Sequence, residues 1–100
     1  MSIIKEVKEK LNSASGPVAR SLHQGEGFRV LTIGFNAGMI MKEHKASISS
    51  KLTVLEGSVL YKEANRAITL SQYEEIDIPI QVIHSVEALE DSLCLLTQGN

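Results

Sequence analysis

Cysteine and aromatic residues are scarce in this 100-residue chain. Cys94 is the only cysteine, so no disulfide can form within the chain and a cysteine-rich zinc site is excluded. A single cysteine is typical of a reducing compartment, and we expect a cytoplasmic protein. Tryptophan is absent and only 4% of the residues are aromatic, which leaves few rings on which bases or sugars could stack.

Neither an excess of positive charge nor a long hydrophobic run is present. Lys and Arg total 10 against 12 Asp and Glu, so the formal net charge is -2. Nucleic-acid binding requires cations that neutralise phosphates, and we expect no nucleic-acid partner. The most apolar stretch, Val30 to Met41, is interrupted by Asn36 and is shorter than the roughly 20 residues that a membrane-spanning helix needs. The charged N-terminus lacks the apolar run of a secretory signal, so we expect no membrane partner.

The chain is long enough for one compact domain, because 43% of its residues are hydrophobic. Residues 2–12 are predicted to form a short amphipathic helix that begins after Ser2, a good N-cap. Its apolar residues recur at helical spacing: Ile3, Ile4, Val7 and Leu11. We assign residues 1–16 to this helix and a linker, and residues 17–100 to a β-domain. The helix is expected to cover the open side of that domain or to contact a second subunit.

Beyond Pro17, short β-branched and aliphatic runs alternate with Gly, Asn, Ser or Pro, which predicts an all-β domain. The expected strands are 18–23, 27–35, 38–43, 51–56, 58–62, 66–70, 74–78, 82–88 and 91–97. So many short strands are typical of a sandwich or barrel.

Two details of these strands bear on function and packing. Val82, His84 and Val86 are expected to share the inward face of their strand, because alternate residues of a strand point the same way. Between Val30 and Leu31 the apolar positions change parity. That change predicts either a β-bulge or burial on both faces, and the second would need another sheet or subunit.

Two segments have the residue spacing of the cupin motifs. Gly38, His44 and Gly57 match the first motif, G-x(5)-H-x-H-x(3,4)-E-x(6)-G. Pro79 and His84 match the second, G-x(5)-P-x-G-x(2)-H-x(3)-N. The chain therefore resembles the cupin superfamily, in particular the small single-domain cupins, many of which have no assigned function.

The resemblance covers roughly residues 18–98 and implies a double-stranded β-helix, which is a jelly-roll barrel around a small cavity. It also implies a homodimer, and it implies that His44 and His84 meet inside the barrel. The residues expected to line a ligand-binding cavity are His44, His84, Met39, Met41, Ser50 and Gln81. For the two methionines, packing in the core is the favoured alternative.

The sequence departs from the metal-binding cupins at two of four ligand positions. Those proteins use two histidines and a glutamate of the first motif and one histidine of the second, whereas this chain has His44, Ala46, Ser50 and His84 there. Zinc hydrolases keep three protein ligands, and non-haem iron oxygenases need a carboxylate. A divalent Fe, Mn, Ni or Zn ion would thus need a recruited ligand. The candidates near the first motif are Glu43 and Glu56, and those near the second are Glu75 and Gln81.

Three functions remain open at this point. The leading prediction is a module that binds a small molecule in its cavity, with an incomplete metal site and no assigned catalytic residue. The alternative is a metal-dependent oxygenase or isomerase with His44 and His84 as ligands. A third possibility is that the fold serves assembly alone, with the functional surface outside the barrel. For His44 and His84, the alternative to any functional role is that they are remnants of an ancestral site, hydrogen-bonded inside the barrel. His23 and Cys94 are expected to be an exposed polar residue and a buried apolar one.

Overall fold

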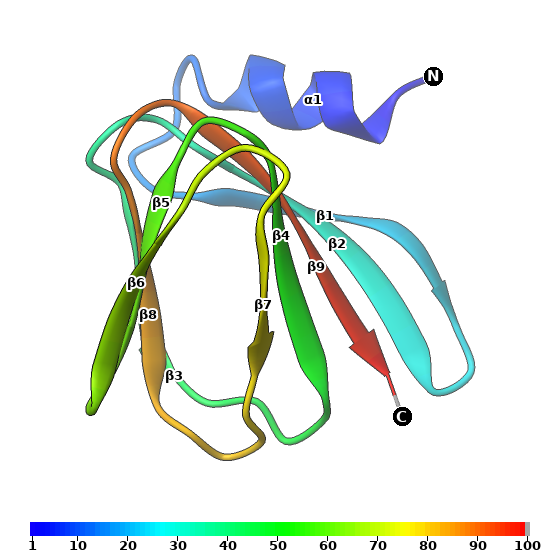
Figure 1. Ribbon diagram of the computed structural model, residues 1–100. Helices are drawn as coiled ribbons and strands as arrows, with labels where there is room; N and C mark the ends of the chain where they lie inside the picture. The colour runs from blue at the N-terminus through cyan, green and yellow to red at the C-terminus, as the bar shows by residue number, and fades with distance from the viewer. Residues whose placement is uncertain (100) are drawn as a thin grey trace.

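The computed structural model describes residues 1–99, which form a short helix followed by nine strands (Figure 1). The elements are α1 (Ile3–Lys10), β1 (Val18–Gly25), β2 (Phe28–Phe35), β3 (Ile40–His44), β4 (Ser50–Glu56), β5 (Val59–Glu63), β6 (Arg66–Leu70), β7 (Glu75–Ile78), β8 (His84–Ala88) and β9 (Ser92–Gly99). Each end lies within two residues of its predicted position. The expected helix and strands are therefore confirmed. Val82 lies outside β8, because residues 79–83 form a loop.

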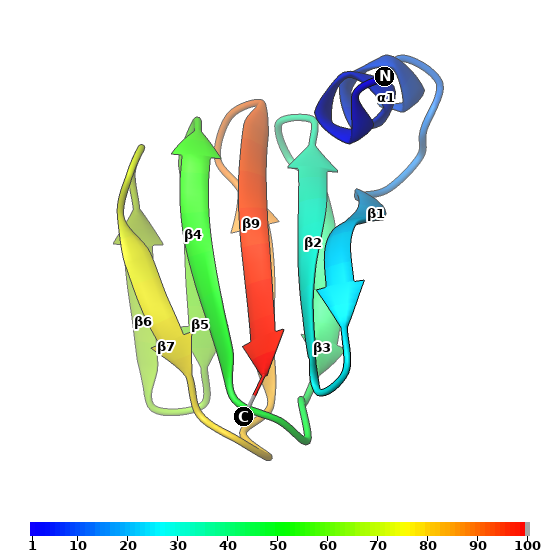
Figure 2. The same cartoon turned by 90° about the vertical axis from the view of Figure 1, so that its right-hand side faces the viewer.

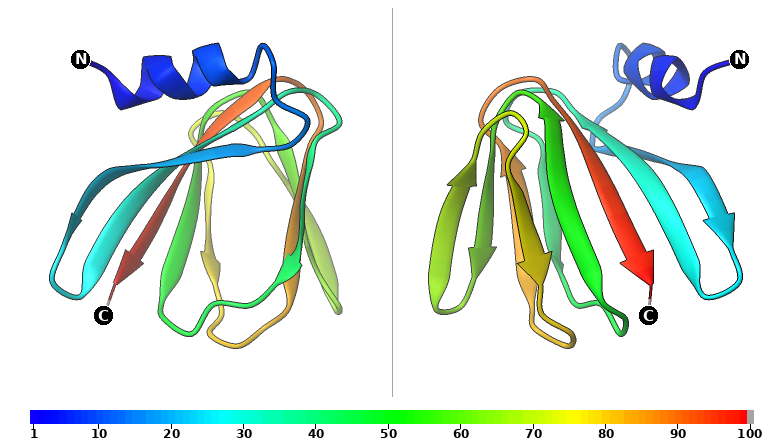
Figure 3. Two further views of the ribbon diagram at one scale, coloured as in Figure 1. Left: turned by 180° about the vertical axis from the view of Figure 1, so that it is seen from behind. Right: turned by 45° about the vertical axis from the view of Figure 1, so that its right-hand side comes forward.

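The strands build two antiparallel sheets that face each other (Figures 1 and 3). One sheet has the order β1-β2-β9-β4-β7 and the other has the order β3-β8-β5-β6. Consecutive strands often belong to different sheets, which is the arrangement of a jelly roll. The inward faces of both sheets form the main core, in which Phe35 and Tyr61 are fully buried. The predicted all-β jelly roll is confirmed.

Helix α1 packs on the outer face of the five-stranded sheet, at one end (Figure 2). The Ser2 side chain caps it by accepting a hydrogen bond from a backbone N–H of the first turn. Val7 is fully buried against Val18 and Leu93. Gly34 allows this approach, since a Cβ atom there would lie 2.6 Å from Val7 Cγ1. The helix thus covers a sheet face and not the open side of the barrel as expected. Within residues 1–99 no helix is long and apolar enough to span a membrane.

The docking of α1 explains the apolar pattern of β2. Strand β2 pairs with β9 in unbroken register, so the bulge expected near Val30 is absent from it. The irregular register lies in β1, between Ser21 and His23. The last four residues of β2 are buried because the core covers one face and α1 covers the other. Burial on both faces is therefore correct, although a helix supplies the second layer and not another sheet or subunit.

Gly57 lies in the turn after β4, where the chain packs closely against the start of β9. Its φ is +83°, and an added Cβ atom would collide with Asp91 O and Ser92 Oγ at the start of β9. We expect Gly57→Ala to lower the free energy of unfolding by about 3 kcal/mol, because left-handed backbone strain and the collision act together. Urea unfolding monitored by circular dichroism measures this loss.

Gly16→Ala is the matched control. No heavy atom lies within 4 Å of the position of an added Cβ atom at Gly16. The stability of this variant is expected to stay within about 0.5 kcal/mol of the wild type. Equal stability of the two variants would contradict the packing of this turn.

Candidate ligand-binding cavity

His84 is the first residue of β8, an inner strand of the four-stranded sheet, and faces the space between the sheets. Strand β8 pairs with β3 and β5, so His84 is opposite His44 on one side and Glu63 on the other. Residues directly opposite in antiparallel strands share a face. The ring centroids of His44 and His84 lie 4.3 Å apart, with 57° between the ring planes. His84 is 3% exposed, which agrees with the inward orientation predicted from alternation, while His44 is exposed.

The two imidazoles have the same tautomer. Nδ1 of His44 lies 2.9 Å from the Lys42 carbonyl oxygen, and Nδ1 of His84 lies 3.1 Å from the Val82 carbonyl oxygen. A carbonyl only accepts, so we assign the proton of each neutral ring to Nδ1. No hydrogen bond among residues 1–99 involves either Nε2. Each ring therefore offers an Nε2 lone pair to a ligand.

A charged network supports the buried side of His84. The Tyr61 ring stacks on the His84 ring with centroids 5.7 Å apart, and the Tyr61 hydroxyl donates to Glu63 Oε2 at 2.5 Å. Arg66 donates to both Glu63 oxygens at 2.8 Å. These bonds from Arg66 and Tyr61 lower the pKa of Glu63 to about 2. Burial raises the pKa of Tyr61, so its hydroxyl stays protonated.

Burial also acts on His84 itself. Desolvation lowers the pKa of His84 from its ordinary value of 6.5, because water is not there to stabilise the imidazolium. The bond to the Val82 carbonyl opposes this shift, since it favours the charged ring. His84 is therefore neutral at pH 7.

The facing sheet contributes a second polar row. Arg29, Gln98 and Ser50 are cross-strand neighbours on β2, β9 and β4. Arg29 Nε donates to Gln98 Oε1 at 2.6 Å, and Gln98 Nε2 donates to Ser50 Oγ at 3.0 Å. Ser50 Oγ in turn donates to the Ile48 carbonyl oxygen at 3.1 Å. Each residue of this row donates a hydrogen bond to the next one, and the Ser50 hydroxyl donates its hydrogen to the Ile48 carbonyl oxygen. This hydrogen is therefore not available to a ligand.

A cavity of about 380 Å³ lies between the two polar rows. Its lining residues are Ala19, Arg29, Leu31, Ile33, Met41, His44, Lys45, Ala46, Ser47, Ile48, Ser50, Ile78, His84, Leu96 and Gln98. The structure thus brings together four of the six residues expected at the cavity: His44, His84, Met41 and Ser50.

Met39 and Gln81 lie elsewhere. Met39 packs against the main core, and its sulfur accepts the backbone N–H of Asn36. Gln81 has a φ of +64° in the loop before β8, and its side chain is exposed. Its backbone N–H donates to the Ala46 carbonyl oxygen at 2.9 Å. Gln81 therefore ties the loop before β8 to the loop after β3 instead of lining the cavity.

The carboxylates considered for a metal site are committed elsewhere. Glu56 forms an ion pair with Lys8 at 2.7 Å, and Glu75 lies 3.8 Å from Lys51. Glu43 is exposed and does not line the cavity. Glu56 and Glu75 belong to the other sheet, and Glu43 is not among the residues that line the cavity although it directly precedes His44.

The donors at the cavity do not fit a metal ion. Imidazole nitrogens are ligands for iron and zinc, but Ala46 has no donor atom and the Ser50 oxygen is held in the polar row. The carboxylate of Glu63, opposite His84, is bound by Arg66. Among residues 1–99, no group of three or more His, Cys, Asp and Glu side chains is placed to hold a metal ion.

Several of these residues were not predicted. Arg29 and Gln98 could have been found by alternation, since they continue the inward faces of Leu31 and Leu96. Tyr61, Glu63 and Arg66 surround the hairpin turn between β5 and β6, and no local pattern connects them with His84.

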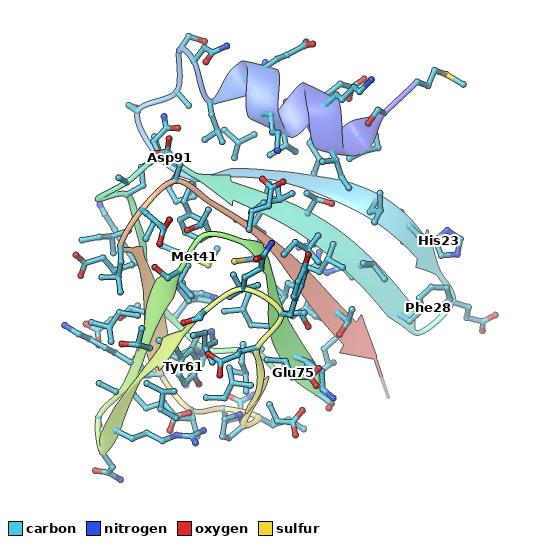
Figure 4. All side chains as sticks on the ribbon, turned by 45° about the horizontal axis from the view of Figure 1, so that its top comes forward. His23, Phe28, Met41, Tyr61, Glu75 and Asp91 are labelled. Carbon is cyan, nitrogen blue, oxygen red and sulfur yellow. The ribbon has the colours of Figure 1, made fainter. Side chains whose placement is uncertain are left out.

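Two other residues have no part in the cavity. Cys94 is fully buried in the core, and burial raises its pKa to about 12, so the thiol is inert at neutral pH. His23 is exposed and lies beside Phe28 at the far end of the β1–β2 hairpin, whereas Met41 and Tyr61 lie in the body of the sandwich (Figure 4).

Solved structures show which fold this is. A cupin-2 domain protein from Shewanella frigidimarina aligns with a TM-score of 0.76 over 100% of this chain and 95% of that one, at 17% identity. An RmlC-like cupin from Desulfovibrio desulfuricans aligns with a TM-score of 0.77 over 84% and 82%, at 24% identity. The chain has the cupin fold. The predicted jelly-roll cupin barrel is thereby confirmed.

The cupin fold also relates this chain to part of a larger enzyme. Salicylate 1,2-dioxygenase from Pseudaminobacter salicylatoxidans aligns with a TM-score of 0.87 over 96% of this chain and 32% of that chain, at 15% identity. No family model matches the sequence, and no curated protein matches it either. At these identities the likeness is one of fold, and it assigns no activity to this chain.

The titration of His84 and Glu63 predicts two separate losses of stability in acid. Unfolding lets His84 take up a proton at its ordinary pKa of 6.5, so stability is full above pH 6.5 and falls as the pH drops below it. The folded pKa of Glu63 lies below its ordinary value of 4.5, so a second contribution is lost as the pH falls from 4.5 towards about 2. Urea unfolding across this pH range measures both.

Variants assign each loss to its residue. His84→Gln is expected to flatten the first decline, and Glu63→Gln the second. His23→Gln and Glu26→Gln remove the same groups from exposed positions and are expected to leave both declines in place. An unchanged first decline in His84→Gln would rule out a buried neutral His84.

Proposed function

We propose that this cupin binds a small molecule in the cavity between its sheets. The observation that carries the proposal is that His44 and His84 both line the cavity, while no hydrogen bond among residues 1–99 involves either of their Nε2 atoms. A volume of about 380 Å³ lies within the range of small-molecule pockets. The cavity combines an aliphatic wall with a few convergent polar groups, which is the usual composition of such pockets.

The wall chemistry restricts the size and kind of ligand. Apart from the two imidazoles, the lining has no aromatic ring. The apolar lining residues are Leu31, Ile33, Met41, Ile48, Ile78 and Leu96, with Ala19 and Ala46 at smaller positions. A compact aliphatic ligand suits this wall better than a large planar one, because extended stacking has no partner here.

Binding fits these side chains better than covalent catalysis does. A covalent mechanism needs an activated nucleophile. Cys94 is buried in the core and does not line the cavity, and the Ser50 hydroxyl donates to the Ile48 carbonyl instead of to a base. The Tyr61 hydroxyl is bonded to Glu63. The two histidines remain available for hydrogen bonding to a ligand or for proton transfer.

The cavity can be tested by blocking it. Ala46→Phe places a ring in the cavity lining, and we expect small fragments that bind the wild type to lose affinity by at least about tenfold. Ligand-detected NMR with a mixed set of neutral and charged aliphatic fragments measures binding, and the methyl signal of Met41 locates it. Ala67→Phe, on the exposed face of β6, is the matched control.

Two results would contradict small-molecule binding at this site. One is that fragments bind Ala46→Phe as well as they bind the wild type. The other is that no fragment, neutral or charged, moves the Met41 methyl signal of the wild type.

A metal-dependent oxygenase or isomerase is the second candidate, favoured only by the two Nε2 atoms of His44 and His84, which no hydrogen bond among residues 1–99 involves. Our proposal predicts that protein purified from a metal-replete culture carries iron, manganese, nickel or zinc well below one ion per chain, because a third ligand is missing. Elemental analysis measures this. Near-stoichiometric metal that is lost in His44→Ala and in His84→Ala would favour the enzyme instead.

A further inference from the structure

The charge of the cavity is opposite in sign to that of the chain. The chain has a formal charge of -2, yet no Asp or Glu lines the cavity, while Arg29 and Lys45 do. We propose that the occupant is a small aliphatic carboxylate whose anionic group is held by Arg29, with Lys45 adding attraction. This inference rests on the proposed function, since it names the chemical class of the molecule that the cavity takes.

Arg29 is oriented into the cavity by its strand and by one hydrogen bond. It lies on the same face of β2 as Leu31 and Ile33, both of which line the cavity. Arg29 is also exposed, so its guanidinium lies where the cavity opens to solvent. The bond from its Nε to Gln98 Oε1, at 2.6 Å, fixes the plane of the group.

Gln98 is itself held in place, and this leaves one edge of the guanidinium for a ligand. Gln98 donates to Ser50, and Ser50 donates to the Ile48 carbonyl, so the whole row is anchored to the backbone. Among residues 1–99, no hydrogen bond or ion pair involves the terminal nitrogens of Arg29. Terminal guanidinium nitrogens match a carboxylate with two parallel hydrogen bonds.

Neither of these cations has a carboxylate partner within the described part of the chain, residues 1–99. Glu63 is the acidic residue opposite His84, and its charge is balanced by the two bonds from Arg66. A positive potential focused in a low-dielectric cleft attracts anions. The aliphatic wall next to it suits a short hydrocarbon chain attached to the anionic group.

The test compares isovalerate with isovaleramide, its neutral analogue of nearly equal shape. NMR titration follows the Met41 methyl signal and the ring signals of His84. We expect isovalerate to bind at least about tenfold more tightly than isovaleramide, since hydrogen bonds to charged groups are about twice as strong as neutral ones. Arg29→Gln is expected to weaken isovalerate binding by about tenfold and to leave isovaleramide binding unchanged.

Two further variants distinguish the loss of a positive charge at the cavity from a general effect of substitution on the folded protein. Arg20→Gln removes the same side chain from β1, where Arg20 is exposed and does not line the cavity, and isovalerate binding is expected to stay at the wild-type level. Lys45 lies in an exposed loop and forms no hydrogen bond with Arg29, Gln98 or Ser50. Lys45→Gln therefore removes a positive charge from the cavity lining without altering the hydrogen bonds that hold Arg29. We expect it to weaken isovalerate binding by a smaller factor. Thermal unfolding checks that each variant is folded.

The outcomes distinguish this inference from the proposed function. If isovaleramide and isovalerate bind equally at Met41, or if Arg29→Gln leaves isovalerate binding unchanged, carboxylate recognition by Arg29 is overturned while small-molecule binding stands. Absence of isovalerate binding at Met41, with neutral fragments still binding there, also overturns it. If neutral fragments fail as well, the proposed function is overturned too.

Discussion

The site depends on the pairing of β8 with strands on both sides. Because β8 pairs with β3 and with β5, His84 is opposite His44 and Glu63 at once. A shift of one residue in this register would turn His84 to solvent, since successive side chains of a strand point to opposite faces. The alternating burial of β8 shows that Val86 and Ala88 hold the register, because both are buried in the core on the same face as His84.

The two sheets differ in how the charged side chains at the cavity are paired. On the four-stranded sheet, the charge of Glu63 is balanced by Arg66 and supported by the Tyr61 hydroxyl. On the five-stranded sheet, the partner of Arg29 is the neutral side chain of Gln98, and no ion pair among residues 1–99 includes Arg29. The cavity between them therefore has a positive end although the chain is slightly acidic. Charge in a cleft can differ in sign from net charge, because local geometry decides which groups are compensated.

Much of the fold could be predicted from the sequence, and much less of the site. Apolar alternation is a local signal, so it located the strands and the inward face of His84. The position of α1 could not be predicted, because it depends on the open surface at Gly34, which forms only when β1, β2 and β9 are assembled. Met39 was expected at the cavity because it alternates with Met41, but it precedes β3 and packs against the core instead.

The sequence by itself determined the strand pattern, the single-domain size and the two missing ligand positions at Ala46 and Ser50, because these follow from residue type and spacing along the chain. Only the tertiary structure decided which charges remain uncompensated. Arg29 and Gln98 are 69 residues apart in sequence and adjacent in space. Contacts between such distant residues are set by strand order and register, so the row that orients Arg29 exists only in the folded barrel.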